Sequence, residues 1–87
     1  MELKEEFENA VARWKEFTRR PPNEELLQLY ALYKQATEGD INSDRPGGFD
    51  FKAIAKYEAW EAVKGRSKEQ AMKDYVSLVG KLHQQYT

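Results

Sequence analysis

Residues 26–39 decide the fold, and they read LLQLYALYKQATEG. At about 100° per residue, Leu29, Leu32 and Ala36 lie on one face of a helix, as a buried stripe requires. The opposite face is unusual, because it combines phenol rings and an ammonium group with leucines. Such a face suits a ligand that is aromatic in one part and anionic in another. The alternative is that the tyrosines pack in the core and the lysine extends to water. This second face holds Leu26, Leu27, Tyr30, Tyr33 and Lys34.

Residues before this stretch predict a first helix. Apolar side chains recur at helical spacing from about Leu3 to Phe17, and the Pro21-Pro22 pair stops the helix. The second helix begins at Pro22 or Asn23 and ends at Gly39, which we expect in a left-handed conformation. A loop rich in turn-forming residues follows over 40–50.

Two further helices are expected after the loop. Asp50 can cap a third helix that reaches about Lys64, with Gly65 beyond its end. Ser67 and Gln70 form a capping box that opens a fourth helix. No alternating strand pattern is present, so the fold class is all-α, with four helices in one domain over residues 1–87. The third helix offers the core Ile54, Ala55, Ala59, Ala62 and Val63, and the fourth offers Met72, Tyr75, Val79, Leu82 and Tyr86.

Composition limits the function and the location. The chain has 87 residues and a net charge of -1, so no overall field recruits nucleic acid. There is no cysteine, so disulfides and thiolate sites are excluded. No run approaches the ~18 apolar residues of a membrane span, so we expect no stable membrane insertion. The first residues carry mixed charge and no apolar signal core. The expected location is the cytoplasm.

Catalytic and metal-binding patterns are missing from the sequence. His83 is the only histidine and lies between polar residues, so we expect it to be solvated. Asp40, Asp44 and Asp50 resemble calcium ligands, but the spacing and terminal glutamate of a calcium loop are absent. No nucleophile has a base beside it. We therefore expect no catalytic residue, no metal site and no cofactor.

The remaining candidates form a set of lysines and tyrosines distributed over all four helices. Each is weak alone, because surface lysines are common and aromatic residues at helical spacing usually belong to the core. The set gains meaning only if the fold brings its members together. It comprises Lys15, Tyr30, Tyr33, Lys34, Lys52, Lys56 and Tyr75.

The chain resembles the acyl-CoA-binding proteins nearly from end to end, from Phe7 to Tyr86. The run YALYKQATEGDIN at residues 30–42 closely resembles the signature of that family. The resemblance continues through RPG at 45–47 and DFK at 50–52. It then includes the pairs AK at 55–56, AW at 59–60 and KG at 64–65. It extends to SKEQAMKDY at 67–75.

The resemblance implies a four-helix up-down-down-up bundle that binds medium- and long-chain acyl-CoA without covalent chemistry. It implies that Tyr33 stacks on adenine, that Lys34 and Lys56 hold the ribose 3′-phosphate, and that Tyr30 bonds in the phosphate region. Further ligand contacts are implied for Lys15, Lys52 and Tyr75, and an acyl groove for Phe7, Val11, Leu26, Leu27 and Leu29. The implied protein is a monomeric carrier with transient contacts to membranes or to enzymes that use acyl-CoA.

Three positions depart from the family pattern. Tyr57 stands where many members have tryptophan, Gly48-Phe49 replaces a pair of larger apolar residues, and Val11 replaces a smaller residue. None of them removes an implied phosphate or adenine contact.

Two other functions remain open from the residues themselves. One is a bundle that docks a partner helix, and the other is an enzyme such as a thioesterase or isomerase.

Overall fold

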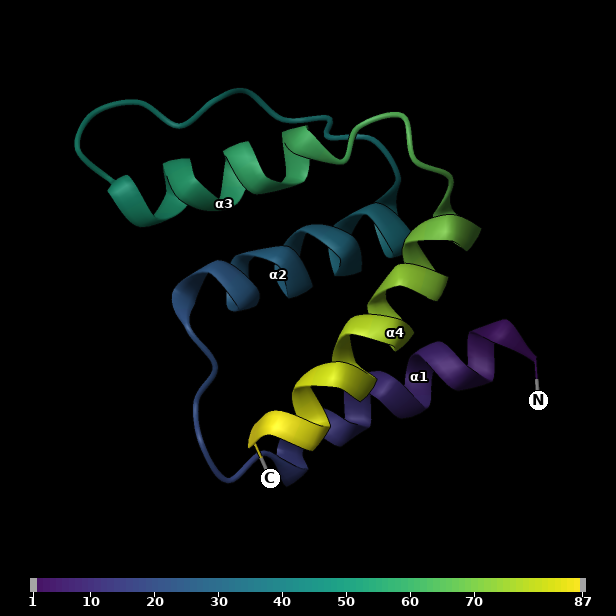
Figure 1. Ribbon diagram of the computed structural model, residues 1–87. Helices are drawn as coiled ribbons and strands as arrows, with labels where there is room; N and C mark the ends of the chain where they lie inside the picture. The colour runs from purple at the N-terminus through teal and green to yellow at the C-terminus, as the bar shows by residue number, and fades with distance from the viewer. Residues whose placement is uncertain (1, 87) are drawn as a thin grey trace.

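The computed structural model describes residues 2–86, and these fold into four α-helices and one short 3₁₀ helix (Figure 1). No strand occurs within the described range. The expected all-α fold is therefore confirmed. The helices are α1 at Leu3–Arg13, η1 at Trp14–Glu16, α2 at Asn23–Glu38, α3 at Phe51–Ala62 and α4 at Lys68–Tyr86.

The order of the helices in space is α1, α4, α2 and α3. α4 packs against both α1 and α2, and the other side of α2 carries α3. In Figure 1, α2 and α3 run in one direction while α1 and α4 run in the other, which gives the expected up-down-down-up topology. The shortest extent of the Cα trace is 15 Å. Because the Cα atoms of one helix lie on a cylinder about 4.6 Å across and packed helices lie about 8–10 Å apart, this extent corresponds to about two layers of helix.

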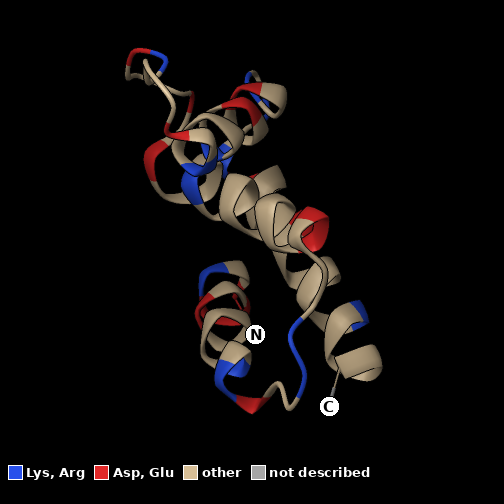
Figure 2. Cartoon of the chain, turned by 90° about the vertical axis from the view of Figure 1, so that its left-hand side faces the viewer, with Lys and Arg blue, Asp and Glu red and all other residues tan. Residues whose placement is uncertain are grey.

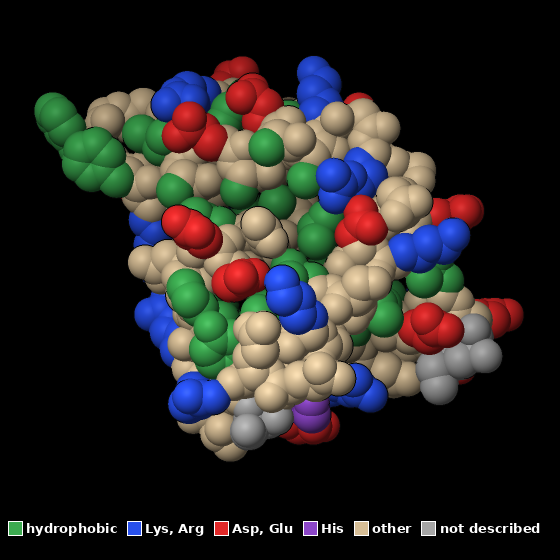
Figure 3. Space-filling model, in the orientation of Figure 1, with side chains coloured by type: hydrophobic (Ala, Val, Ile, Leu, Met, Phe, Trp, Pro, Cys, Tyr) green, Lys and Arg blue, Asp and Glu red, His purple; other side chains and the backbone are tan. Residues whose placement is uncertain are grey.

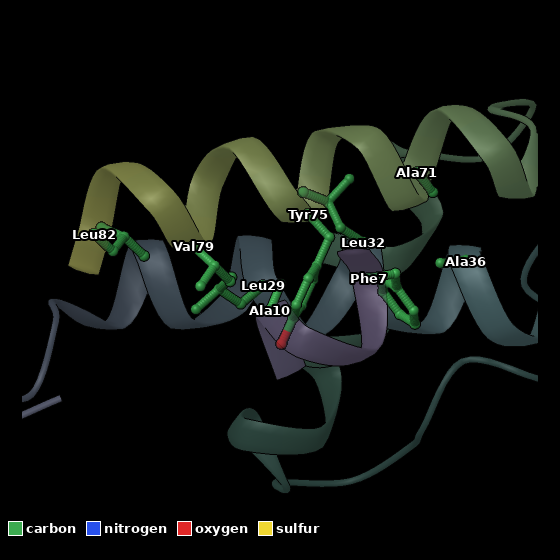
Figure 4. Packing of buried hydrophobic residues seen from close by; sticks show 9 residues of the cluster. All are labelled: Phe7, Ala10, Leu29, Leu32, Ala36, Ala71, Tyr75, Val79 and Leu82. Atoms are coloured by element: carbon green, nitrogen blue, oxygen red, sulfur yellow. The ribbon is translucent and has the colours of Figure 1, made fainter. Parts of the chain in front are cut away.

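The core lies where α2, α4 and α1 meet (Figure 4). The predicted stripe of α2 is confirmed, because Leu29, Leu32 and Ala36 are all buried there. The expected contribution of the third helix is mostly wrong, since Trp60 is the only buried residue of α3 and, of the residues expected, only Val63 just beyond its end packs against the core cluster. α3 covers one side of α2 and adds little to the core. The remaining cluster members are Phe7, Ala10, Ala71, Tyr75, Val79 and Leu82.

The first helix ends earlier than its apolar spacing predicts. α1 stops at Arg13 and η1 continues to Glu16, where Phe17 was the expected end. Phe17 is extended instead, with φ −67° and ψ 124°. The backbone N–H groups of Thr18 and Arg19 donate to the carbonyl oxygen of Tyr86 at 2.9 and 3.2 Å. The turn after η1 is therefore attached to the end of α4, a contact that local spacing cannot reveal.

Helix ends follow the predicted capping chemistry in part. Asp50 accepts from the backbone N–H of Ala53 at 3.1 Å, which confirms it as the cap of α3. Ser67 accepts from the N–H of Gln70 at 3.0 Å, but the Gln70 side chain donates to Asp74 instead of completing the box. Gly39 has φ 84° and ψ −151°, so its φ is positive but its conformation is not the expected left-handed helical one.

Charged side chains of both signs are interspersed along the chain (Figure 2). This distribution agrees with the net charge of -1 and shows that any attraction for an anion must be local. His83, which we expected to be solvated, lies with Nε2 3.0 Å from the Oε1 atom of Glu16 and packs the edge of its ring against Phe17. It helps to join η1 to α4.

Leu82→Ala should lower the free energy of unfolding by about 2–5 kcal/mol, because the side chain is fully buried and its removal leaves a cavity. Leu78→Ala, one turn earlier on α4, is the matched control. Leu78 is only partly buried, so its truncation should cost clearly less. Urea titration followed by circular dichroism measures both values, and equal losses would contradict this packing.

Candidate functional site

A groove opens between the first turns of α2 and α3. Its volume is about 530 Å³, and we call it the α2–α3 groove. Arg20, Lys52 and Lys56 bring three cations to its lining, and no acidic residue lines it. The groove can therefore hold an apolar chain beside anionic groups. Its apolar surface comes from Leu26, Leu27, Tyr30, Phe51 and Ala55.

A second hollow continues this surface on the side of α2 that faces α4. It measures about 220 Å³, and we call it the tyrosine hollow. Leu26 and Tyr30 line both the groove and the hollow. A third space of about 200 Å³, beside the loop 40–50, is also lined by Tyr30 and by Lys56. Tyr30 is thus the centre of one connected surface. The hollow is lined in addition by Trp14, Leu29, Tyr33 and Tyr75.

Two of the candidate lysines lie over aromatic rings. The Lys56 Nζ atom is 5.3 Å from the centroid of Tyr30, and the Lys34 Nζ atom is 5.4 Å from that of Trp60. Lys34 also forms an ion pair with Glu38, one turn later on α2. The hydrogen bond to Glu38 raises the pKa of Lys34, and burial acts in the other direction. Each ammonium group therefore lies over a ring of the neighbouring helix, Lys56 of α3 over α2 and Lys34 of α2 over α3.

Three aromatic rings meet beside the tyrosine hollow. Phe7 stacks on Tyr33 with centroids 5.9 Å apart and meets Tyr75 edge-on at 5.1 Å. Tyr75 is buried, and burial together with nearby Tyr33 raises its pKa. Tyr33 remains 40% exposed although one side of its ring is supported by Phe7. The alternative that the tyrosines of the second helix pack in the core is therefore wrong for Tyr33, and Tyr30 is only partly buried. Tyr75 does belong to the core.

The structure brings most of the candidate residues together but leaves some apart. Lys15 is exposed on η1, next to Trp14. Phe7 belongs to the buried core, and Val11 packs against that core. Lys34 lies on the Trp60 side of α2. The candidates that line the groove or the hollow are Leu26, Leu27, Leu29, Tyr30, Tyr33, Lys52, Lys56 and Tyr75.

The sequence reasoning missed several residues of this surface. Arg20 lines the groove from the connection between η1 and α2, where its guanidinium also donates to Asn23 at 3.3 Å. Its position before Pro21 predicts an extended backbone but not a place in a groove. Phe51 and Trp14 were assigned to helices without a role at the site. Helical spacing cannot show which residues meet across helices that are distant in sequence.

A buried glutamine fixes α3 and the following turn against α2. Gln35 has 0% exposure. Its Nε2 atom donates to Asp40 at 2.8 Å and to the carbonyl oxygen of Arg66 at 2.7 Å. Its Oε1 atom accepts from Trp60 Nε1 at 3.2 Å. One amide thus connects α2, α3 and both loops at this end of the molecule.

The loops complete this network. Trp60 Nε1 also donates to the carbonyl oxygen of Gly39 at 2.9 Å, and the carboxylate of Asp40 accepts from the N–H of Gly65 at 2.8 Å. Two hydrogen bonds lower the pKa of Asp40. The larger effect comes from the N–H of Gly65 and the smaller one from Gln35. The indole ring that lies under Lys34 is therefore held from two sides.

Within residues 2–86, no group of three or more histidine, aspartate or glutamate side chains is placed to hold a metal ion. None of the helices in this range is both long and apolar enough to cross a membrane.

Comparison with known proteins identifies the family. The sequence model described as "Acyl CoA binding protein" matches residues 4–79. An acyl-CoA-binding protein of Brassica napus is 50% identical over 82 residues, covering 94% of this chain and 89% of the relative. One from Dictyostelium discoideum is 51% identical over 80 residues, covering 92% and 95%. The crystal structure of Oryza sativa Acyl-CoA-Binding Protein 2 superimposes with a TM-score of 0.91 and 45% identity, covering 97% of this chain and 93% of that one. The chain belongs to the acyl CoA binding protein family.

Gln35→Leu should lower the free energy of unfolding by about 2–3 kcal/mol, because the change leaves buried partners of the amide without hydrogen bonds. Gln28→Leu, on the exposed side of the same helix, should change it by less than about 0.5 kcal/mol. Denaturant titration of the two variants beside the parent checks this. A Gln35 variant as stable as the Gln28 variant would show that the network is dispensable.

Asp40→Asn should reduce the acid sensitivity of the protein. The pKa of Asp40 is lower in the folded state than its ordinary 3.8. The ionised carboxylate therefore makes its full contribution to the free energy of unfolding above that pH. This contribution is lost as the pH falls from about 3.8 through the lower folded-state pKa. An asparagine oxygen keeps both acceptor roles without titrating. The stability difference between parent and variant, measured by urea titration from pH 7 downwards, should shrink below pH 3.8. A constant difference would show that Asp40 does not take part in acid unfolding.

Proposed function

We propose that this protein binds medium- and long-chain acyl-CoA esters non-covalently, as a single acyl-CoA-binding domain over residues 1–87. The observation that carries the proposal is the α2–α3 groove, which combines an apolar lining with three cations and no acid. Membership of the acyl CoA binding protein family supports the same function. Proteins of this family bind acyl-CoA and are not enzymes, so the thioesterase or isomerase alternative is not favoured.

The nucleotide end of the ligand is assigned to the tyrosines and lysines around α2. Adenine stacks on the exposed part of Tyr33, an interaction worth about 1–3 kcal/mol by analogy with base stacking on aromatic residues. Lys34 and Lys56 hold the ribose 3′-phosphate, and Tyr30 donates a hydrogen bond in the phosphate region. Lys15, Lys52 and Tyr75 make the further contacts. The position of Lys52 in the groove and of Lys15 beside Trp14 supports these roles.

Lys34 must exchange its partner to take part. In the free protein it pairs with Glu38, and the side chains are 27% and 43% exposed. Exposed pairs of this kind contribute only about 0–1 kcal/mol, so exchange of the carboxylate for a phosphate costs little. The phosphate carries close to two negative charges and attracts the ammonium more strongly than one carboxylate does.

The acyl chain is assigned to the apolar part of the surface. Leu26 and Leu27 line the α2–α3 groove, and Leu29 lines the tyrosine hollow. Phe7 acts through its contact with Tyr33, and Val11 through its packing on the core. Each buried CH₂ contributes about 0.8 kcal/mol until the groove is full. Head and tail therefore bind together, and either fragment alone binds more weakly.

The cellular role that we propose follows from binding without chemistry. The protein acts as a monomer in the cytoplasm, stores acyl-CoA and delivers it through transient contacts with membranes or with enzymes that use it. It has no cofactor. A bundle that docks a partner helix explains the leucines of α2, but it gives no reason for three cations around an apolar groove.

Calorimetric titration with palmitoyl-CoA, free CoA and palmitate tests the function. We expect one-to-one binding of the thioester at micromolar concentration or below, with much weaker binding of both fragments. The double variant Tyr33→Ala/Lys56→Ala should lose most of this affinity. Absence of thioester binding would refute the function, and unimpaired binding by the double variant would refute the site.

Lys56→Met should weaken palmitoyl-CoA binding by about 10- to 100-fold, because a charged hydrogen bond contributes about 1.5–3 kcal/mol. Lys81→Met, on the exposed side of α4, is the matched control and should stay within about twofold. Titration with palmitoyl-CoA that lacks the 3′-phosphate identifies the group involved. The Lys56 effect should largely vanish with that ligand, and an effect of the same size on both ligands would assign Lys56 to another part of the ligand.

A further inference from the structure

Two phenylalanine rings stand in water at the beginning of α3. Phe49 is 89% exposed and Phe51 is 73% exposed, far more than the other exposed large hydrophobic residues of the described chain. Their ring centroids are 6.4 Å apart, so they form one apolar projection, which we call the aromatic tip. Figure 3 shows hydrophobic side chains that project from the corner where α3 begins in Figure 1. Single exposed apolar residues are ordinary, but an adjacent projecting pair indicates an interaction surface.

The backbone holds the aromatic tip in a defined turn. The N–H of Phe51 donates to the carbonyl oxygen of Phe49 at 2.9 Å, across Asp50. Asp50 has φ −81° and ψ 78°, values close to those of an inverse γ-turn. Its carboxylate at the same time caps α3 through Ala53. The two rings are therefore presented by the helix start itself.

The aromatic tip is continuous with the α2–α3 groove. Phe51 belongs to both, and the next residue, Lys52, lines the groove as well. The lining carries three cations and no acid, so the surface behind the tip is complementary to a negatively charged one. An apolar path thus leads from the tip to Leu26 and Leu27 on α2.

We propose that the aromatic tip inserts into the surface of an anionic lipid bilayer and places the α2–α3 groove at that surface. This inference rests on the proposed binding of acyl-CoA, whose chain then moves between bilayer and groove without crossing water. The projecting shape favours a bilayer, because lipids rearrange around an inserted ring whereas a protein partner must provide a matching pocket. Binding is reversible, since the tip is small.

Vesicle flotation tests the insertion. Phe49 is the residue to change, because it lines neither the groove nor the hollow. Without acyl-CoA, Phe49→Ser should reduce binding to vesicles of phosphatidylcholine and phosphatidylserine in equal parts by about tenfold, the effect of keeping one ring in water. Phe49→Trp retains an apolar ring and should bind at least as well as the parent. Palmitoyl-CoA affinity should stay within about twofold in both variants.

Delivery of the ligand provides a second measurement. With a fluorescent acyl-CoA loaded on the parent protein, the rate of transfer to these vesicles should rise with vesicle concentration, because transfer occurs during contact. With Phe49→Ser the rate should lose most of this dependence, since the ligand must first dissociate into water.

The outcomes separate the two proposals. Parent protein that does not float with the vesicles at millimolar lipid, or equal flotation of parent and Phe49→Ser, would overturn the bilayer inference. The bilayer inference would also be overturned if Phe49→Ser abolished binding to a protein partner while vesicle binding stayed unchanged. Failure of the parent to bind palmitoyl-CoA in solution would overturn the proposed function instead, whatever the vesicles show.

Discussion

The hydrogen bonds of the buried Gln35 amide are the constraint on which the arrangement of α2 and α3 depends. The amide lies within α2, yet its partners belong to α3 and to the loops on either side of α3. No buried side-chain nitrogen or oxygen in the described chain is left without a partner. A different placement of α3 would leave this buried amide without its partners, at a cost of about 1–3 kcal/mol. The hydrogen bonds of this amide therefore help to fix the position of α3, together with the burial of Trp60.

The α2–α3 groove results from this way of fixing α3 against α2. α3 contributes one fully buried side chain, Trp60, and its other apolar residues remain partly exposed. A helix held mainly by apolar packing would close against α2 and remove the space between them. Attachment at one end, through Trp60 and the Gln35 network, leaves the other end free to present Lys52 and Lys56 beside the leucines of α2. The network and the groove occupy opposite ends of the same helix pair.

Local chemistry allowed most of the fold to be predicted from the sequence. The apolar stripe of α2 and the cap at Asp50 depend on neighbours in sequence, and both are observed. Of the residues expected from α4, Tyr75, Val79 and Leu82 are buried, while Met72 and Tyr86 are only partly buried against the core. Predictions failed where a distant group decides the local structure. The turn after η1 is attached to the carbonyl oxygen of Tyr86, which is distant in sequence. Gln35 looked like an ordinary polar residue, because its partners come from segments whose placement spacing cannot give. The candidate lysines and tyrosines could be named, but that several of them line one surface required the tertiary structure.

The order of the helices in space has a consequence for synthesis. α1 packs on α4, which is made after the other three helices described, and it reaches α2 through side chains such as Phe7 on Tyr33. At about 5–20 residues per second, α1 waits on the order of several seconds before α4 is available. During that time its apolar stripe is open to chaperones or to other nascent chains, and an isolated helix of this length is marginal in water. α1 therefore completes its folding only after the whole length of chain from α1 to α4 has been made.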